Sequence, residues 1–195
     1  MHELEPHYKW RDRYTAETDE SSPFFGRIYS EFEFSNKIYN YFIHPQWDHF
    51  GSGTLYTKIL FADYDDGFAI MEFIGEWNDC INNDIMWLKR DVIDVLMQNG
   101  IHRFILIGEN VLNAHVEDDS YYEEWYEDVK EEDGWICCLN FRKHVIEEMV
   151  GGNLQYYLNF DEPFNDLNWR AHKPINLFRL VDQYIRNPRV LLLRN

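Results

Sequence analysis

The spacing of apolar and polar residues changes along the chain, and these changes divide it into predicted elements. Apolar and polar residues alternate in residues 27–34 and 37–44, which predicts a β-hairpin with a short polar turn. Residues 55–64 and 68–76 form a second predicted hairpin, in which Gly67 can adopt the positive φ of a tight turn. The N-terminal third is therefore predicted to be antiparallel.

A helical period replaces the strand period after the second hairpin. Apolar residues fall on one face of residues 83–98, Asn82 or Asn83 can cap the start, and Gly100 follows the end. Residues 103–108 are short, apolar and continuous, as is typical of a strand covered on both faces. The pattern thus predicts a helix followed by a buried strand.

A second helix is predicted to begin at Ser120. Ser120 and Glu123 have the spacing of a capping box, and Gly134 supplies the end. The remaining predicted elements are a strand at 135–140, a helix at 142–150, a strand at 154–160, a helix at 174–186 and a strand at 190–193.

The order of these elements predicts the fold class. Strands joined by connections of helical length must lie parallel, with right-handed crossovers. We therefore expect an α/β fold, in which a mixed sheet with parallel βαβ units is flanked by helices and preceded by antiparallel N-terminal hairpins. No linker rich in Pro, Gly or Ser divides the 195 residues, so a single domain is expected, with residues 1–22 as a mobile or draped arm.

Composition restricts the classes of partner. The net charge of -17 opposes direct binding to nucleic acid or to anionic lipid. No signal segment opens the chain and no apolar stretch approaches the ~18 residues of a membrane span, so a soluble, cytoplasmic protein without membrane association is expected. Residues 170–195 carry six basic side chains against Asp182 alone, and this basic end could fold back onto the acidic body or join subunits of a homo-oligomer.

The cysteines and one histidine-containing loop are the candidate metal or redox sites of the sequence. Cys80, Cys137 and Cys138 lack Cys-x-x-Cys spacing, which favours buried, reduced thiols. The donors His44, Asp48 and His49 lie close together in sequence but match no established zinc spacing, so the main prediction contains no metal and no cofactor.

Two parallel strands run into the same three residues, Ile-Gly-Glu, which end at Glu76 and Glu109. Ligands bind beyond the carboxyl ends of parallel strands, so these carboxylates could form an acid-base pair with His115 in support. The alternative is that each glycine allows a sharp turn and each glutamate is solvated or caps the next segment. The other polar candidates at this edge, as ligand-binding residues, are Asn78, Asp79, Asn110, Asn113, Asn140 and Arg142.

The predicted second helix lies in a strongly acidic segment. Residues 117–133 contain ten acidic residues and one lysine, which suits a basic surface on a protein partner. The alternative is a solvated face that maintains solubility. The candidate partner-binding residues are Tyr121, Glu123, Glu124, Glu127 and Asp128.

A hairpin that leads into a βαβα run resembles the STAS domain, the anti-sigma-factor-antagonist superfamily, over residues 55–150. In that family a phosphorylatable serine follows an aspartate at the start of the helix after a central strand. Asp119 and Ser120 stand at the matching place. The resemblance implies a regulator that binds another protein, with Ser120 at the position of the family's phosphorylatable serine.

Two functions are therefore predicted. The first is a non-enzymatic regulatory or adaptor protein that binds a protein partner through the acidic helix. The alternative is a small-molecule or metal-dependent enzyme, hydrolase-like, that uses Glu76 and Glu109, and this alternative requires both carboxylates to face one pocket.

Overall fold

The computed structural model describes residues 4–30, 32–160 and 162–187. Its centre is a four-stranded sheet in the order β3-β4-β5-β6, and a separate two-stranded hairpin precedes it. β3 and β4 pair in antiparallel fashion, whereas β5 pairs in parallel with β4 on one side and with β6 on the other. The α/β fold class with a mixed sheet is confirmed. The strands are β1 (Lys37–Ile38), β2 (Tyr41–Phe42), β3 (Leu55–Asp63), β4 (Phe68–Asn78), β5 (Arg103–His115) and β6 (Trp135–Leu139).

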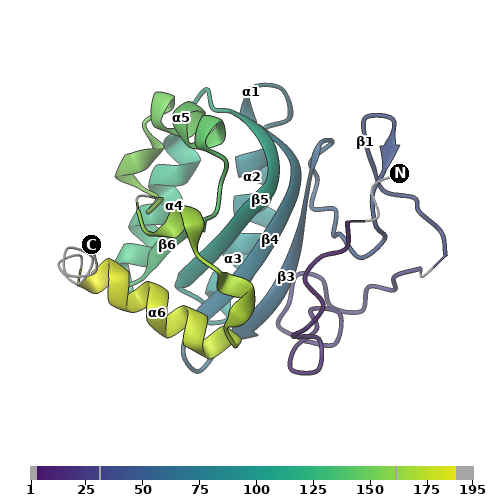
Figure 1. Ribbon diagram of the computed structural model, residues 1–195, viewed down its shortest axis with the longest axis horizontal. Helices are drawn as coiled ribbons and strands as arrows, with labels where there is room; N and C mark the ends of the chain where they lie inside the picture. Colours follow the sequence, from purple (N-terminus) through teal and green to yellow (C-terminus); the bar gives the residue numbers. More distant parts are fainter. Residues whose placement is uncertain (1–3, 31, 161, 188–195) are drawn as a thin grey trace.

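Helices cover both faces of the sheet (Figure 1). The first helical region is continuous apart from the break at Asn83, and it contains one turn of π-helix, η1. Within the described ranges no helix has the length and apolar content of a membrane span. The helices are α1 (Asp79–Asn82), α2 (Asp84–Leu88), η1 (Lys89–Ile93), α3 (Asp94–Gln98), α4 (Ser120–Glu131), α5 (Lys143–Gly151), η2 (Leu154–Tyr156), η3 (Phe164–Asp166), η4 (Trp169–Ala171) and α6 (Pro174–Arg186).

Successive side chains along the strands point to opposite faces of the sheet, and they form one hydrophobic core on each face. Phe104 and Leu106 of β5 pack with the helices α2 to α5, whereas Ile105 and Ile107 face α6. Both faces of residues 104–108 are buried because helices lie on both sides, which explains the continuous apolar sequence in this part of the strand. Cys137 and Cys138 divide between the two cores in the same way, and both are buried free thiols. Cys80 is exposed, so the prediction of a buried thiol is wrong there, because α1 lies at the surface.

The N-terminal segment packs against the sheet without forming regular structure. Residues 4–26 consist of coil and turns, and they lie beside β3 in Figure 1. Trp10 joins the core under α6, and Ala16 joins the core on the opposite face. The hydroxyl groups of Tyr14 and Tyr64 both donate to Asp19, which links the segment to the end of β3. Packing and side-chain hydrogen bonds therefore hold this segment in place.

Two predicted strands are absent. Alternation over 27–44 predicts a full hairpin, but only the two-residue strands β1 and β2 pair, and Ile28 is 97% exposed. The alternation there does not correspond to burial, because this segment extends away from the sheet. Residues 154–160 form the turn of η2 and a single bridge from Asn159 to Cys137 instead of a strand. The strand predicted at 190–193 lies outside the described residues.

Two helices have bounds close to those predicted from the apolar pattern, whereas the predicted N-terminal caps are not formed. The helix over 174–186 has the predicted bounds, and the region 83–98 is helical from Asp84 to Gln98. Asn83 precedes α2 in the left-handed conformation (φ 53°) without a side-chain cap. α4 begins after Asp119 with no side-chain cap, so the predicted capping box is not formed.

Candidate functional site

The two glutamates that follow Ile-Gly are not brought together. β4 and β5 continue past them, to Asn78 and His115 respectively. A bulge sets the register so that Ile74 pairs with Asn110 and Glu76 pairs with Asn113. Glu76 therefore lies beyond Glu109 along the sheet.

The carboxylate that shares a partner with Glu109 is Glu72, which is not among the site residues predicted from the sequence. The Arg170 guanidinium forms a salt bridge with Glu109 and lies 3.5 Å from the Oε1 of Glu72. Glu72 also accepts a hydrogen bond from the backbone N–H of His7 at 2.8 Å and a longer one from Asn110 at 3.4 Å. A signal for Glu72 does exist, since it is the only charged residue within the apolar run 68–74, and a buried charge requires partners.

The pKa values of the two glutamates move in opposite directions. Burial raises the pKa of Glu72 to about 7, and the His7 backbone N–H and Arg170 only partly oppose this effect. Burial alone would also raise the pKa of Glu109, but hydrogen bonds from Asn140, Arg170 and Trp169 outweigh it and lower this pKa. Burial likewise lowers the pKa of the neighbouring His7 to about 4, with Arg170 adding to the effect.

This network closes the site around Glu72 and Glu109. Glu72 is 1% exposed, and both oxygens of Glu109 already accept hydrogen bonds. The Oε1 atom of Glu109 accepts from Asn140 at 2.9 Å and from the indole of Trp169 at 2.8 Å. The network therefore attaches the N-terminal segment and η4 to the face of the sheet. It leaves Glu72 little access to a substrate, and it engages both oxygens of Glu109.

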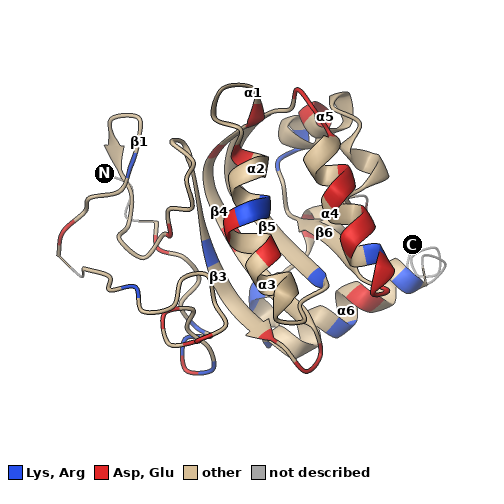
Figure 2. Ribbon diagram, turned by 180° about the vertical axis from the view of Figure 1, so that it is seen from behind, with Lys and Arg blue, Asp and Glu red and all other residues tan. Residues whose placement is uncertain are grey.

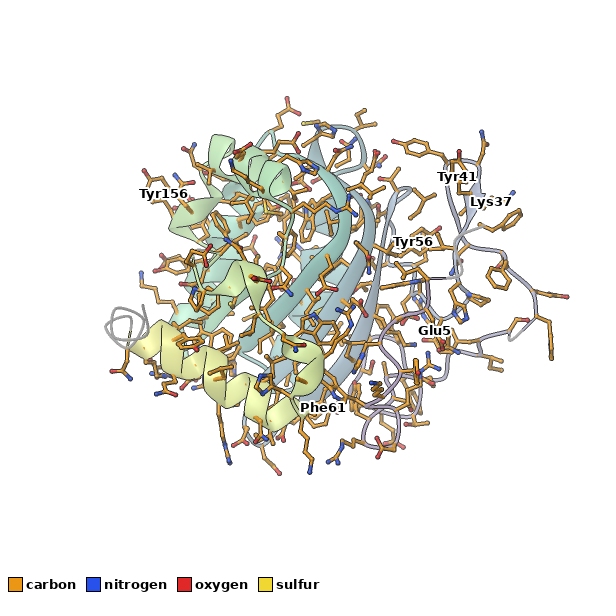
Figure 3. The ribbon with its side chains drawn as sticks, viewed as in Figure 1. Glu5, Lys37, Tyr41, Tyr56, Phe61 and Tyr156 are labelled. Atoms are coloured by element: carbon orange, nitrogen blue, oxygen red, sulfur yellow. The ribbon has the colours of Figure 1, made fainter. Side chains whose placement is uncertain are left out.

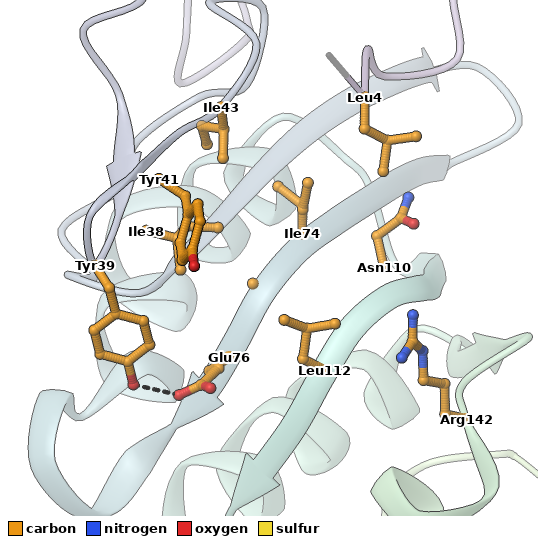
Figure 4. Close-up of a pocket in the computed structure, with 11 residues that line it drawn as sticks. Leu4, Ile38, Tyr39, Tyr41, Ile43, Ile74, Glu76, Asn110, Leu112 and Arg142 are labelled. Carbon is orange, nitrogen blue, oxygen red and sulfur yellow. Dashed lines mark hydrogen bonds between the residues drawn. The ribbon is translucent and has the colours of Figure 1, made fainter. Parts of the chain in front are cut away.

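Glu76 lines a different space, a cavity of about 320 Å³ shown in Figure 4. Its carboxylate accepts a hydrogen bond from the Tyr39 hydroxyl at 2.5 Å and one from Asn113 at 3.4 Å. Asn110 and Arg142 line the same cavity, whereas Glu109 lines a separate, shallower hollow with Asn140 and η4. Two of the predicted ligand-binding residues thus meet Glu76 in one cavity, and its predicted partner Glu109 does not.

The other candidates at this edge stabilise local structure. The Asn78 side chain caps α1 by accepting from the N–H of Ile81 at 2.9 Å. Burial raises the pKa of Asp79 to about 6, although the hydrogen bond that its carboxylate accepts from Tyr122 opposes this effect. Asn140 fixes the segment before η4 by two hydrogen bonds with the backbone of Leu167. The side chain of His115 is exposed and takes no part in the Glu109 network.

The acidic face of α4 is partly neutralised within the chain (Figure 2). Arg90 of η1 pairs with Glu124 through two short hydrogen bonds, and Lys89 pairs with Asp128 at 2.9 Å. Tyr121 is partly buried and lies 5.4 Å from the Arg90 guanidinium. Glu127 pairs with Lys130, so Glu123 is the predicted partner-binding acid without an ion pair in the described chain.

An acidic groove of about 610 Å³ lies between α1 and the start of α4. Its acidic lining residues are Asp79, Glu117, Asp118 and Asp119. Ile81 also lines it and is 82% exposed, so the groove combines negative charge with an apolar contact. We refer to this space as the acidic groove.

The loop that holds His44, Asp48 and His49 does not arrange them as ligands. The Asp48 side chain is buried. It accepts a hydrogen bond from the Tyr29 hydroxyl at 2.6 Å and forms a salt bridge with Arg27 at 3.2 Å. Across the described ranges no three His, Cys, Asp or Glu side chains converge as metal ligands would.

Comparison of the chain with protein families, curated proteins and solved structures found no match. The resemblance to the STAS domain accordingly stays a prediction.

Proposed function

We propose that the protein is a non-enzymatic regulatory or adaptor protein that binds a basic segment of another protein. The observation that carries this proposal is the acidic groove, in which several carboxylates surround the exposed side chain of Ile81. A lysine- or arginine-rich segment with one apolar side chain would match both features.

The distribution of ion pairs favours the start of α4, rather than its middle, as the binding site for a basic partner. Glu124 and Asp128 are engaged by Arg90 and Lys89, so a partner would have to displace internal salt bridges to reach them. Glu117, Asp118 and Glu123 form no ion pair within the described part of the chain, and their charges are available. Binding is therefore proposed at the acidic groove and the first turn of α4.

The geometry gives less support to the hydrolase-like alternative. A shared acid-base pair requires two carboxylates in one pocket, and Glu76 and Glu109 line different spaces. Glu72, which shares Arg170 with Glu109 and has a raised pKa, is covered by the N-terminal segment.

A variant that neutralises the groove tests the proposal. Glu117→Gln, Asp118→Asn and Glu123→Gln together should reduce the recovery of a bound partner by about tenfold, since each interfacial charge contributes ~0.5 kcal/mol. Partner recovery is measured by pull-down from native lysate and quantitative mass spectrometry. Raising the salt concentration should weaken the wild-type interaction, because the contact is electrostatic.

The matched control removes three exposed acids elsewhere, through Glu20→Gln, Asp65→Asn and Asp66→Asn. This control has the same net charge as the groove variant and should recover the partner as well as the wild type does. Equal recovery by the groove variant and the wild type, or no specific partner at all, would contradict the proposal.

A further inference from the structure

The cavity beside Glu76 occupies the part of the sheet that α6 does not cover. Along this face of β4, Phe68 and Ile70 lie under α6, and Glu72 lies under the N-terminal segment. Ile74 and Glu76 come next, and they form the floor of the cavity with Asn110 and Leu112 of β5. The cavity exists because these two strands extend beyond the elements that pack on them.

The hairpin β1–β2 forms the opposite wall. Figure 3 shows Tyr56 of β3 between the sheet and the hairpin, and its hydroxyl donates to the backbone oxygen of Lys37 at 3.0 Å. The Tyr39 hydroxyl makes a second attachment through Glu76. A hairpin of two-residue strands has little stability of its own, and the packing of Ile38 and Ile43 against Tyr56 and Ile74 adds to these two hydrogen bonds in holding the wall.

The lining is mainly aliphatic. The side chains that contribute apolar surface without a ring are Leu4, Ile38, Ile43, Ile74 and Leu112. A concave space lined by branched aliphatic groups favours a flexible hydrocarbon body, because burial of each CH₂ group contributes ~0.8 kcal/mol.

The cationic side chain of Arg142 lies at the edge of this apolar cavity. The Nε atom of Arg142 donates to the backbone oxygen of Glu109 at 3.3 Å, which fixes the guanidinium at the rim (Figure 4). The terminal nitrogens of Arg142 have no carboxylate partner among the described residues. They can therefore form charge-assisted hydrogen bonds with an incoming anion. Glu76 lines the hairpin side of the cavity and would repel a second anionic group.

We propose that this cavity binds a small aliphatic monocarboxylate. The hydrocarbon chain occupies the space between the hairpin and the sheet, and the carboxylate pairs with Arg142 beside the amide of Asn110. This site is separate from the acidic groove, so the proposal goes beyond the function proposed above and does not depend on it.

Isothermal titration calorimetry with three probes of equal chain length tests the site. Octanoate should bind the full-length protein with a Kd below about 1 mM. Octan-1-ol, which lacks the charge, and octanedioate, which carries a second one, should each bind at least about tenfold more weakly.

Two variants and one control variant locate the binding. Arg142→Gln should weaken octanoate binding at least about tenfold, because it removes a charge-assisted hydrogen bond. Lys143→Gln removes the same charge from the adjacent residue, whose side chain is 91% exposed and outside the cavity, and should change the Kd less than twofold. Leu112→Trp fills the cavity from its floor, where the Leu112 side chain is 42% exposed, and should abolish binding while the circular dichroism spectrum is unchanged.

Three results would overturn the proposal: no heat of binding with octanoate up to several millimolar, equal affinities for octanoate and octan-1-ol, or equal effects of Arg142→Gln and Lys143→Gln. The acidic-groove variant should bind octanoate as the wild type does, so failure of one proposal is distinguishable from failure of the other.

Discussion

Replacing Gly75 with alanine should destabilise the folded protein by more than about 3 kcal/mol. A Cβ atom at this position would lie 2.0 Å from the backbone oxygen of Thr54 and 3.0 Å from the Cδ1 of Ile38. The residue also has a φ of +120°, which alanine rarely adopts. Backbone strain and the steric clash each cost ~1–3 kcal/mol, and a backbone oxygen cannot move aside as a side chain can.

Urea unfolding followed by tryptophan fluorescence measures this effect, and Gly151→Ala is the matched control. Gly151 lies in α5 with no atom within 4 Å of an added Cβ, so alanine there should stabilise the protein by about 0.5–1 kcal/mol. A loss below about 1 kcal/mol for Gly75→Ala would mean that the strand and the segment at Thr54 separate easily.

Gly75 and Gly108 explain why the repeated Ile-Gly-Glu is misleading. The backbone of Thr54 crosses close to Gly75, whereas the ring of Phe141 packs 2.4 Å from the position of a Cβ at Gly108. Each glycine therefore makes room for a different neighbour, and both strands continue past their glycine. The similar sequences reflect two local packing requirements, and they do not indicate one shared site.

The fold could be predicted where periodicity and burial coincide. The helix over 174–186 and the strand at 103–108 have an apolar pattern that tertiary packing uses directly. The hairpin over 27–44 could not be predicted reliably, because alternation indicates a strand only if a neighbouring strand pairs with it. Residues 27–34 have no such neighbour and remain irregular where the structure describes them.

The candidate site was only partly predictable for a similar reason. The structure places Glu76, Asn110 and Arg142 around one cavity, but Glu76 and Asn110 lie within β4 and β5, and only Arg142 follows a parallel strand. Register could not be predicted, and two bulges, each with its extra residue in β5, move Glu76 further from Glu109. The contacts of His7 and Arg170 with Glu72 join residues from opposite ends of the chain, and no local pattern encodes contacts of that kind.

Replacing Glu72 with glutamine should make the folded protein progressively more stable, relative to the wild type, as the pH rises. The pKa of Glu72 is about 7 in the folded protein and has an ordinary value of 4.5. The folded state therefore binds the proton more tightly than the unfolded chain does. The stability that this proton provides is fully present below about pH 4.5 and is lost as the pH rises through about 7. The full loss is about 3 kcal/mol, at ~1.4 kcal/mol for each pKa unit.

The measurement is the difference in the free energy of unfolding between Glu72→Gln and the wild type, from urea unfolding at several pH values. This difference should rise by about 3 kcal/mol between about pH 4.5 and 8. The lowered pKa of His7 has the opposite effect on wild-type stability in the acidic range, but it is common to both proteins and cancels. Glu109→Gln is the control: because the pKa of Glu109 is lowered from 4.5, its difference should fall as the pH rises toward about 4.5 and should stay nearly constant from there to about pH 8. If the charge of Arg170, rather than burial, determined the pKa of Glu72, that pKa would be lowered. The difference in the free energy of unfolding would then change with pH in the same direction for both variants.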